Sequence, residues 1–237
     1  MAKILEMKHI SKSFGGSKAL SNVHFEMEEG EVHALLGENG AGKSTLMNIL
    51  TGVIPADSGK IIFMGKAYVT PTIKEMENAG ISFVHQELNV INDLSVADNI
   101  FLRKELKTKL GLIDEKEQIK KTKELFESLG VEMNPSEMVS NLKTSEKQLL
   151  EICKALYSDA KLLILDEPTT ALSNDEIDHL FGILNRLKKT GKSFVFISHK
   201  MPEIFAVADR YAVFRNGQFI SSGNVKDVDA QKLTSDM

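Results

Sequence analysis

The chain has 237 residues, of which 42% are hydrophobic and 26% charged, as in a globular protein that can bury a sizeable core. A formal net charge of −4 without a long basic run argues against nucleic acid as a partner. The single cysteine, Cys153, excludes an internal disulfide and is compatible with a reducing cytosol.

Neither a membrane span nor a secretion signal is predicted. Charged residues interrupt the apolar residues of Met1–Met7, which is not the pattern of a signal peptide. No stretch approaches the roughly 18 continuous apolar residues that a spanning helix needs. We therefore expect the chain to reach a membrane only through a partner.

The N-terminal residues 4–27 predict two antiparallel strands, since apolar and polar residues alternate from Val23 to Met27. Residues 13–17 predict the turn between them. Phe14 in this turn has two interpretations: a core aromatic at the end of a strand, or a platform on which adenine stacks. Taken alone, its residue type favours the core, where most aromatic side chains pack.

Residues 31–52 predict a strand, a glycine-rich turn and a helix, and the turn follows the phosphate-loop pattern of Gly, four residues and Gly-Lys-Ser. Glycines let successive amides point inward, and the helix adds the positive end of its dipole. Lys43 would supply charge to the β- and γ-phosphates, and the Ser44 hydroxyl would bind magnesium. An accidental glycine-rich turn is the alternative. The expected nucleotide-binding residues are Gly37, Asn39, Gly40, Ala41, Gly42, Lys43, Ser44 and Thr45.

The next predicted elements are a strand over 60–64, a weak helix over 72–79 and a short buried strand over 81–84. The last of these strands runs into Gln86. A polar residue after an apolar strand often marks the ligand crevice of a parallel sheet. An ordinary loop glutamine is the alternative interpretation of Gln86.

Residues 95–158 predict helices without any intervening strand. Ser95 and Asp114 each precede a helical pattern and have an acidic residue three positions later, which resembles a capping box. Gly130 is expected to end the second helix. The block is therefore predicted to be a helical insertion in an otherwise α/β chain.

Two further features of this block are predicted. Ser145, with Gln148 three positions later, is expected to cap a third helix that runs through Leu156. The lysine-rich piece Arg103–Lys109 is most simply a solvated segment.

Strands and helices alternate again after residue 159. A buried strand over 162–165, a helix over 174–189 and a strand over 194–197 are predicted in turn. Asn216-Gly217 then gives the strongest short signal for a β-hairpin. This alternation is typical of a parallel sheet with crossover helices.

The first and last of these strands end in polar residues suited to magnesium-nucleotide chemistry. Asp166 could hold the cation directly or through water, and Glu167 could orient and deprotonate the attacking water. His199 could sense or stabilise the γ-phosphate. The alternatives are a solvated acidic turn before proline and a structural histidine.

The phosphate loop, Gln86, residues 162–168 and His199, in this order and spacing, resemble the ATPase domain of an ABC transporter over essentially the whole chain. The resemblance implies an α/β P-loop NTPase fold with a mixed or parallel core sheet, an N-terminal antiparallel β subdomain and an inserted helical subdomain. It implies a single ABC ATPase domain over residues 1–237. The α/β core would comprise 1–90 and 159–237, and the helical subdomain about 91–158.

The same resemblance implies ATP and Mg²⁺ as cofactors and assigns roles to individual residues. Phe14 matches the aromatic on which adenine stacks. The other implied roles are Walker A for Gly37–Thr45, magnesium binding for Ser44, Gln86 and Asp166, and catalysis for Gln86, Glu167 and His199.

The stretches VHQELNVINDLSVADNIFL, ISHKMPEIFAVADRYAVFRNG and LDEPTTALS are similar to monosaccharide importers of the ribose/galactose type. Two ATPase domains are usually fused in that subfamily, so the chain is expected to be the first domain of a longer protein. The implied function is ATP hydrolysis that powers sugar import at the cytoplasmic face of the membrane. The implied partners are a second ATPase domain, permease subunits and, indirectly, a sugar-binding protein. A soluble ABC-type ATPase and a nucleotide-dependent regulator are the alternatives.

One part of the chain departs from the family pattern. The family signature Leu-Ser-Gly-Gly-Gln aligns with Leu142–Glu146, where Lys143 replaces the serine. Thr144 and Ser145 replace glycines that let the backbone approach a phosphate, and Glu146 adds a negative charge. We therefore expect one competent and one degenerate nucleotide site in each pair of ATPase domains.

Overall fold

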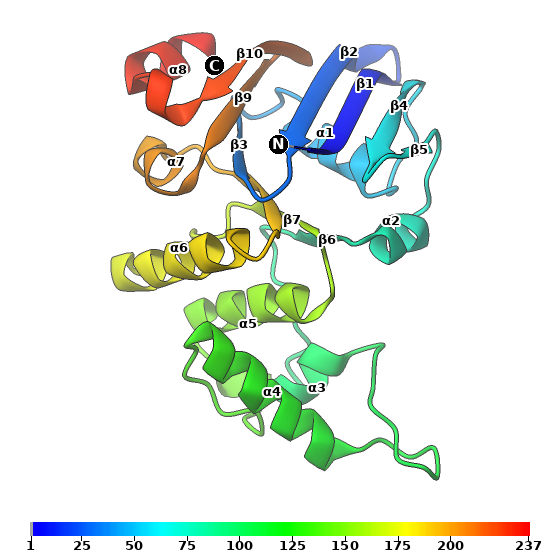
Figure 1. Ribbon diagram of the computed structural model, residues 1–237, viewed down its shortest axis with the longest axis vertical. Helices are drawn as coiled ribbons and strands as arrows, with labels where there is room; N and C mark the ends of the chain where they lie inside the picture. The colour runs from blue at the N-terminus through cyan, green and yellow to red at the C-terminus, as the bar shows by residue number, and fades with distance from the viewer. Residues whose placement is uncertain (1) are drawn as a thin grey trace.

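The computed structural model describes residues 2–237 and contains two β-sheets with helices around and below them (Figure 1). The smaller sheet has four strands in the order β2-β1-β4-β5, and all of its pairings are antiparallel. Its strands are β1 (Lys3–Phe14), β2 (Ser17–Glu28), β4 (Ser58–Phe63) and β5 (Lys66–Tyr68). The predicted N-terminal hairpin is confirmed, whereas the short β5 had no clear sequence signal.

The larger sheet has six strands in the order β10-β9-β3-β8-β7-β6. Its five strands from β9 to β6 are parallel, and β10 pairs with β9 in the antiparallel direction. The expected mixed core sheet is therefore confirmed. Its strands are β3 (Val32–Leu36), β6 (Ile81–Val84), β7 (Leu162–Asp166), β8 (Ser193–Ile197), β9 (Arg210–Arg215) and β10 (Gln218–Asn224).

Both faces of the core sheet are covered, which explains why its strands are continuous apolar runs. On β3, Val32, Ala34 and Leu36 pack into the core shared with the helices on one face, while Leu35 packs toward the smaller sheet. The helices that surround the two sheets are α1 (Lys43–Leu50), α2 (Ile73–Ala79), α6 (Asn174–Lys188), α7 (Met201–Val207) and α8 (Ala230–Asp236), with a 3₁₀ turn η2 (Val225–Asp227).

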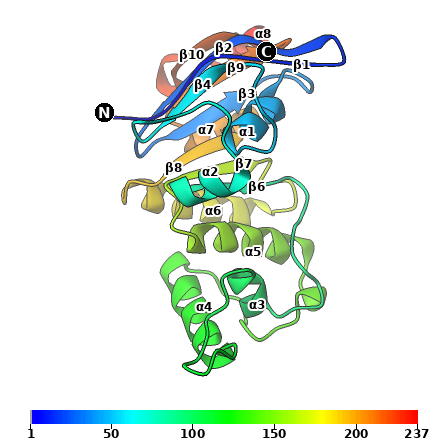
Figure 2. The same cartoon turned by 90° about the vertical axis from the view of Figure 1, so that its right-hand side faces the viewer.

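The predicted helical insertion forms the lower end of the molecule in Figures 1 and 2. Ser95 and Asp114 cap its first two helices by accepting backbone N–H bonds, and Gly130 ends the second in the left-handed conformation, as expected. The insertion comprises α3 (Val96–Phe101), α4 (Glu115–Leu129), the 3₁₀ turn η1 (Val139–Asn141) and α5 (Thr144–Tyr157). Within residues 2–237, no helix is both long and apolar enough to cross a membrane.

The predicted start of α5 is wrong. Ser145 lies inside the helix, and Lys143 is the N-cap residue. Oε2 of Glu146 accepts the backbone N–H of Lys143 over 2.7 Å, so an acidic side chain satisfies the helix terminus in place of the expected serine.

Candidate functional site

The expected site residues follow strands whose carboxyl ends share one edge of the core sheet. The phosphate loop follows β3, Gln86 follows β6, Glu167 follows β7 and His199 follows β8. The four strands are parallel, and β8 lies between β3 and β7. The order of the strands therefore brings segments far apart in the sequence to the ligand edge of an α/β sheet.

The backbone of the phosphate loop requires glycine where it is packed against the rest of the molecule. Gly37 and Gly42 have φ values of +144° and +102°. A Cβ on Gly37 would collide with the carbonyl oxygen of Phe214, and one on Gly42 would lie 2.6 Å from Cδ2 of Leu20. At Gly40, where φ is +84°, an added Cβ would meet nothing within 4 Å. The loop is therefore tightly packed against Phe214 and Leu20 at Gly37 and Gly42, and it is open at Gly40.

The β9–β10 turn supports the phosphate loop from behind. Asn216 and Gly217 both have positive φ, as a type I′ turn requires. The N–H of Gly217 donates to the carbonyl of Ala41 over 3.1 Å, and the N–H of Ser21 donates to the carbonyl of Gly217 over 2.8 Å. The predicted hairpin therefore links the loop to the N-terminal sheet.

Lys43, at the start of α1, is electrostatically coupled to the two acids. Its ammonium donates to the carbonyls of Gly37 and Glu38, within its own loop. Partial burial lowers the pKa of Lys43, and the negative charges of Asp166 and Glu167 oppose that shift. The lysine and both acids, which are more than 120 residues apart in the sequence, are therefore close in the fold.

The pKa of Asp166 also indicates that this acid lies close to Lys43 and Glu167. Burial and then the charge of Glu167 raise its pKa above the ordinary value, while Lys43 and His85 act in the opposite direction. The influence of His85 was not anticipated from the sequence, although this residue immediately follows β6. Perturbed acids beside a lysine and a phosphate loop indicate a functional site.

Glu167 has a strained backbone and one unsatisfied oxygen. Its φ is +48°, which is uncommon for a residue other than glycine, asparagine or aspartate, and its N–H donates to the carbonyl of Ile197 over 2.9 Å. An ionised carboxylate only accepts hydrogen bonds, so Nδ1 of His199 donates to Oε1 over 2.8 Å. Oε2 is buried without a hydrogen-bond partner. Strain and an orphaned acceptor together point to a functional role for this carboxylate.

Three further expected site residues, Ser44, Gln86 and Phe14, are exposed, whereas Ala41 is buried and Thr45 is half-buried. Ser44 lies in the first turn of α1, and Gln86 lies two residues beyond the end of β6. Phe14 is 50% exposed at the end of β1, with Nζ of Lys12 5.4 Å from its ring centroid. The prediction that Phe14 packs in the core is therefore wrong. Phe14 is the last residue of β1 and lies beyond the part of the strand that is packed in the sheet.

A buried polar cluster that the sequence did not reveal joins the loops after β7 and β8. Glu203, in α7, accepts bonds from the hydroxyls of Thr169 (2.8 and 2.9 Å) and Ser198 (2.9 Å). Lys200 lies 3.0 Å from the same carboxylate. Thr169 is two residues from Glu167, and Ser198 precedes His199, so the cluster fixes the two catalytic-site candidates relative to each other.

The side chains at this edge suit a magnesium nucleotide better than a metal held by protein alone. Residues 2–237 include no group of three or more His, Cys, Asp and Glu side chains that could hold a metal ion. Mg²⁺ typically takes one or two carboxylates and completes its shell with phosphates and water. Asp166 would supply one carboxylate to such a shell, and Ser44 and Gln86 are the other expected ligands.

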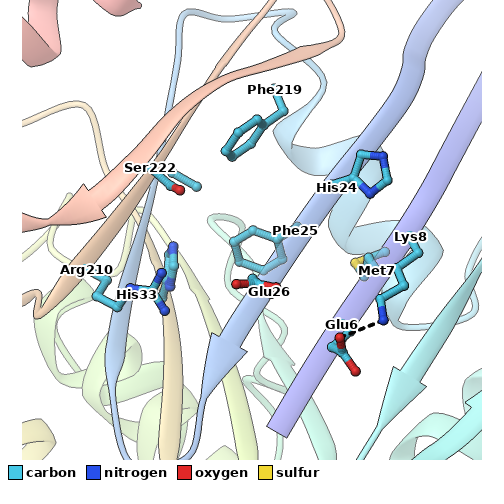
Figure 3. A pocket seen from close by; sticks show the side chains of 11 residues that line it. Glu6, Met7, Lys8, His24, Phe25, Glu26, His33, Arg210, Phe219 and Ser222 are labelled. Atoms are coloured by element: carbon cyan, nitrogen blue, oxygen red, sulfur yellow. Dashed lines mark ion pairs between the residues drawn. The ribbon is translucent and has the colours of Figure 1, made fainter. Parts of the chain in front are cut away.

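A separate cavity of about 190 Å³ lies between the smaller sheet and the β9–β10 hairpin (Figure 3). Phe25, His33, Arg210 and Phe219 are among its lining residues. His33 lies near the start of β3, whereas the phosphate loop follows the end of that strand. None of the expected site residues lines this cavity, so it is distinct from the site described above.

Comparison with known proteins agrees with this geometry. Residues 20–170 match the family model described as ABC transporter. The chain is 48% identical over 233 residues to a ribose import ATP-binding protein of Lacticaseibacillus paracasei and 43% identical to one of Bacillus subtilis. Each alignment covers 98% of this chain and 47% of the relative, so the chain spans about half the length of the curated relatives that it matches.

The fold also matches solved structures. The crystal structure of the ADP conformation of an ATP-binding cassette of an ABC transporter superposes with a TM-score of 0.87 at 26% identity. The match covers 100% of this chain and 98% of the other. The family model alone covers more than half of the sequence. The chain therefore belongs to the ABC transporter family.

Proposed function

We propose that this chain is an ABC ATPase domain that binds and hydrolyses ATP to power the import of a sugar through a membrane transporter. One observation supports the ATPase activity above all: the phosphate loop after β3 and the acids Asp166 and Glu167 at the end of β7 lie at the same edge of the core sheet, because both strands pair in parallel with β8. The relatives are named ribose import ATP-binding proteins, and these names support a sugar as the transported substrate.

In this proposal the phosphate loop and Lys43 bind the β- and γ-phosphates, and the exposed ring of Phe14 stacks on adenine. Ser44, Gln86 and Asp166 hold Mg²⁺, which would neutralise charge on the phosphates. The open side of the loop at Gly40 leaves room for the phosphates.

Glu167 is the proposed general base. Its buried Oε2 would accept the proton of a water whose oxygen attacks the γ-phosphorus, while the bond from that phosphorus to the β–γ bridging oxygen breaks. Nδ1 of His199 donates to Oε1, so this histidine fixes the carboxylate. The exposed fraction of the His199 side chain, 71%, makes it accessible to a ligand.

Permease subunits are the proposed membrane partners, and a cleft of about 970 Å³ is their proposed docking site. The cleft lies between α2 and β6 on one side and α3 and α5 on the other, and Figure 2 shows α2 and α3 on the same side of the molecule. Val53, Met64 and Ile73 expose apolar side chains along it. Phe83 of β6 and His85, which lies between β6 and Gln86, also line the cleft, so a docked segment would contact the residues that lead to the site.

A second ATPase domain is the other proposed partner, and the two nucleotide sites are proposed to be unequal. Glu146 already satisfies the start of α5 through the N–H of Lys143. A carboxylate at this terminus would repel a phosphate from the partner domain. This chain would therefore contribute a competent phosphate loop and a weak signature helix.

The proposed function is tested by measuring ATP hydrolysis of the chain alone and with the permease and sugar-binding protein of its own operon in lipid nanodiscs. We expect hydrolysis to be stimulated by the permease and further by sugar. An Ile73→Glu variant should lose this stimulation, and Val69→Glu, exposed outside the cleft, should keep it. A rate of hydrolysis that does not change when the permease is added would indicate a soluble ATPase. Nucleotide binding without hydrolysis would indicate a regulator.

A further inference from the structure

The segment that joins α3 to α4 forms an ordered hairpin that the proposed function does not use. Lys107 and Ile113 form an antiparallel bridge, and the N–H of Thr108 donates to the carbonyl of Leu112 over 2.8 Å. The N–H of Asp114, the cap of α4, donates to the carbonyl of Leu106 over 2.8 Å. In Figure 1 this connection projects beyond α3 and α4 at the lower right.

The tip of the hairpin is strongly apolar and exposed. The exposed fractions of Leu110, Leu112 and Ile113 are 88%, 68% and 54%. Single exposed apolar residues are common on protein surfaces, but three on one short turn are not. We call these three residues the apolar tip.

The flanks of the hairpin are cationic. Lys104, Lys107 and Lys109 are exposed, and none of them forms an ion pair within the described residues 2–237. One carboxylate oxygen of the neighbouring Glu105 accepts the backbone N–H of Arg103 instead. Solvation accounts for the lysines, as the sequence suggested, but it does not account for the apolar tip between them and α4.

We propose that this hairpin inserts its apolar tip into an anionic lipid surface. Apolar side chains flanked by lysines suit the boundary between acyl chains and headgroups, where lysine stems lie along the apolar region and their charges reach the phosphates. A cytoplasmic permease loop is a poorer partner. Such loops carry an excess of lysine and arginine and would repel Lys107 and Lys109, which lie outside the proposed permease cleft.

The position of the hairpin agrees with this partner. In Figure 1 the hairpin and α2, which lines the proposed permease cleft, both lie on the right-hand side of the molecule. A permease docked in the cleft would turn this side toward the membrane. This orientation rests on the proposed function, whereas binding to protein-free vesicles does not.

The test is co-sedimentation of the 237-residue chain with vesicles of phosphatidylcholine, with and without phosphatidylglycerol, in the absence of permease. The chain should bind the anionic vesicles and release them as salt rises. Lys107→Gln with Lys109→Gln should weaken binding about fivefold for each lysine. Leu110→Ser with Leu112→Ser should weaken it roughly tenfold or more.

Matched controls keep the result specific. Lys123→Gln with Lys189→Gln removes two exposed lysines elsewhere that form no ion pair in residues 2–237, and Val69→Ser removes an exposed apolar side chain. Both control variants should bind like the wild type, and ATP binding should confirm that every variant is folded. No binding to anionic vesicles, or equal loss in hairpin and control variants, would overturn the proposal. Hairpin variants that bind vesicles normally but lose a detergent-solubilised permease would overturn it in favour of a protein contact.

Discussion

Replacing Glu203 should destabilise the protein and slow its chemistry, because this buried carboxylate holds the loops after β7 and β8 together. Thr169 and Ser198 are 0% and 2% exposed and both donate to it. Each hydrogen bond to a charged acceptor contributes about 1.5–3 kcal/mol. Lys200 is 38% exposed on its side chain and can turn toward water, so its contact adds little.

From these contacts, Glu203→Ala should lower the free energy of unfolding by about 3–5 kcal/mol, measured by urea denaturation. Glu203→Gln keeps an oxygen acceptor and should cost about 1–2 kcal/mol. Glu127→Ala, at an exposed position of α4, is the matched control and should change stability by about 0.5 kcal/mol or less.

The glutamine variant also separates positioning from binding. It should lower the kcat of ATP hydrolysis while leaving ATP affinity close to that of the wild type, because Glu167 and His199 shift and the phosphate loop does not. The reasoning fails if Glu203→Ala is as stable as the Glu127 control. It also fails if Glu203→Gln loses ATP affinity at an unchanged kcat.

Three further predictions concern the site. Glu167→Gln with ATP should remain monomeric by size-exclusion chromatography, since Glu146 occupies the start of α5; a tight symmetric dimer would show that the signature helix is unimpaired. The raised pKa of Asp166 means that the folded chain binds its proton more tightly than the unfolded chain, so stability falls as pH rises through that range. Asp166→Asn should therefore raise the melting temperature at neutral pH, and a gain that persists in acid would contradict the assignment. Gly42→Ala should destabilise by about 2 kcal/mol or more, because its Cβ would collide with Leu20, whereas Gly40→Ala should cost only about 1 kcal/mol. Equal losses of stability for the two variants would contradict the tight packing of the loop at Gly42.

The sequence predicted the elements whose signals are local. The β9–β10 turn needed only Asn216-Gly217, and the buried strands of the core sheet needed only short apolar runs. The start of α5 could not be read in the same way. Ser145 is a better capping residue by type, but the chain turns at Lys143 and Glu146 reaches back to its N–H.

Contacts between segments far apart in the chain could not be predicted from the sequence. The bond from Thr169 to Glu203 joins residues 34 apart and depends on how β7 and β8 are aligned. The exposure of Phe14 depends on where β1 passes beyond the packed sheet, which apolar alternation does not encode. The positions of Gln86, Glu167 and His199 along the chain were predictable, because each of them follows a strand with a clear apolar pattern.

The most direct test of a shared Mg·ATP site is calorimetric titration of ATP into the wild type and Asp166→Asn, with and without Mg²⁺. Asp166 is close to Lys43, so we expect the variant to bind Mg·ATP at least about tenfold more weakly, or about 1.4 kcal/mol. Metal-free ATP should bind as tightly or more tightly, because a negative charge beside the phosphates is removed. Identical Mg²⁺ dependence in the two proteins would contradict a site in which the acid and the lysine hold one magnesium nucleotide.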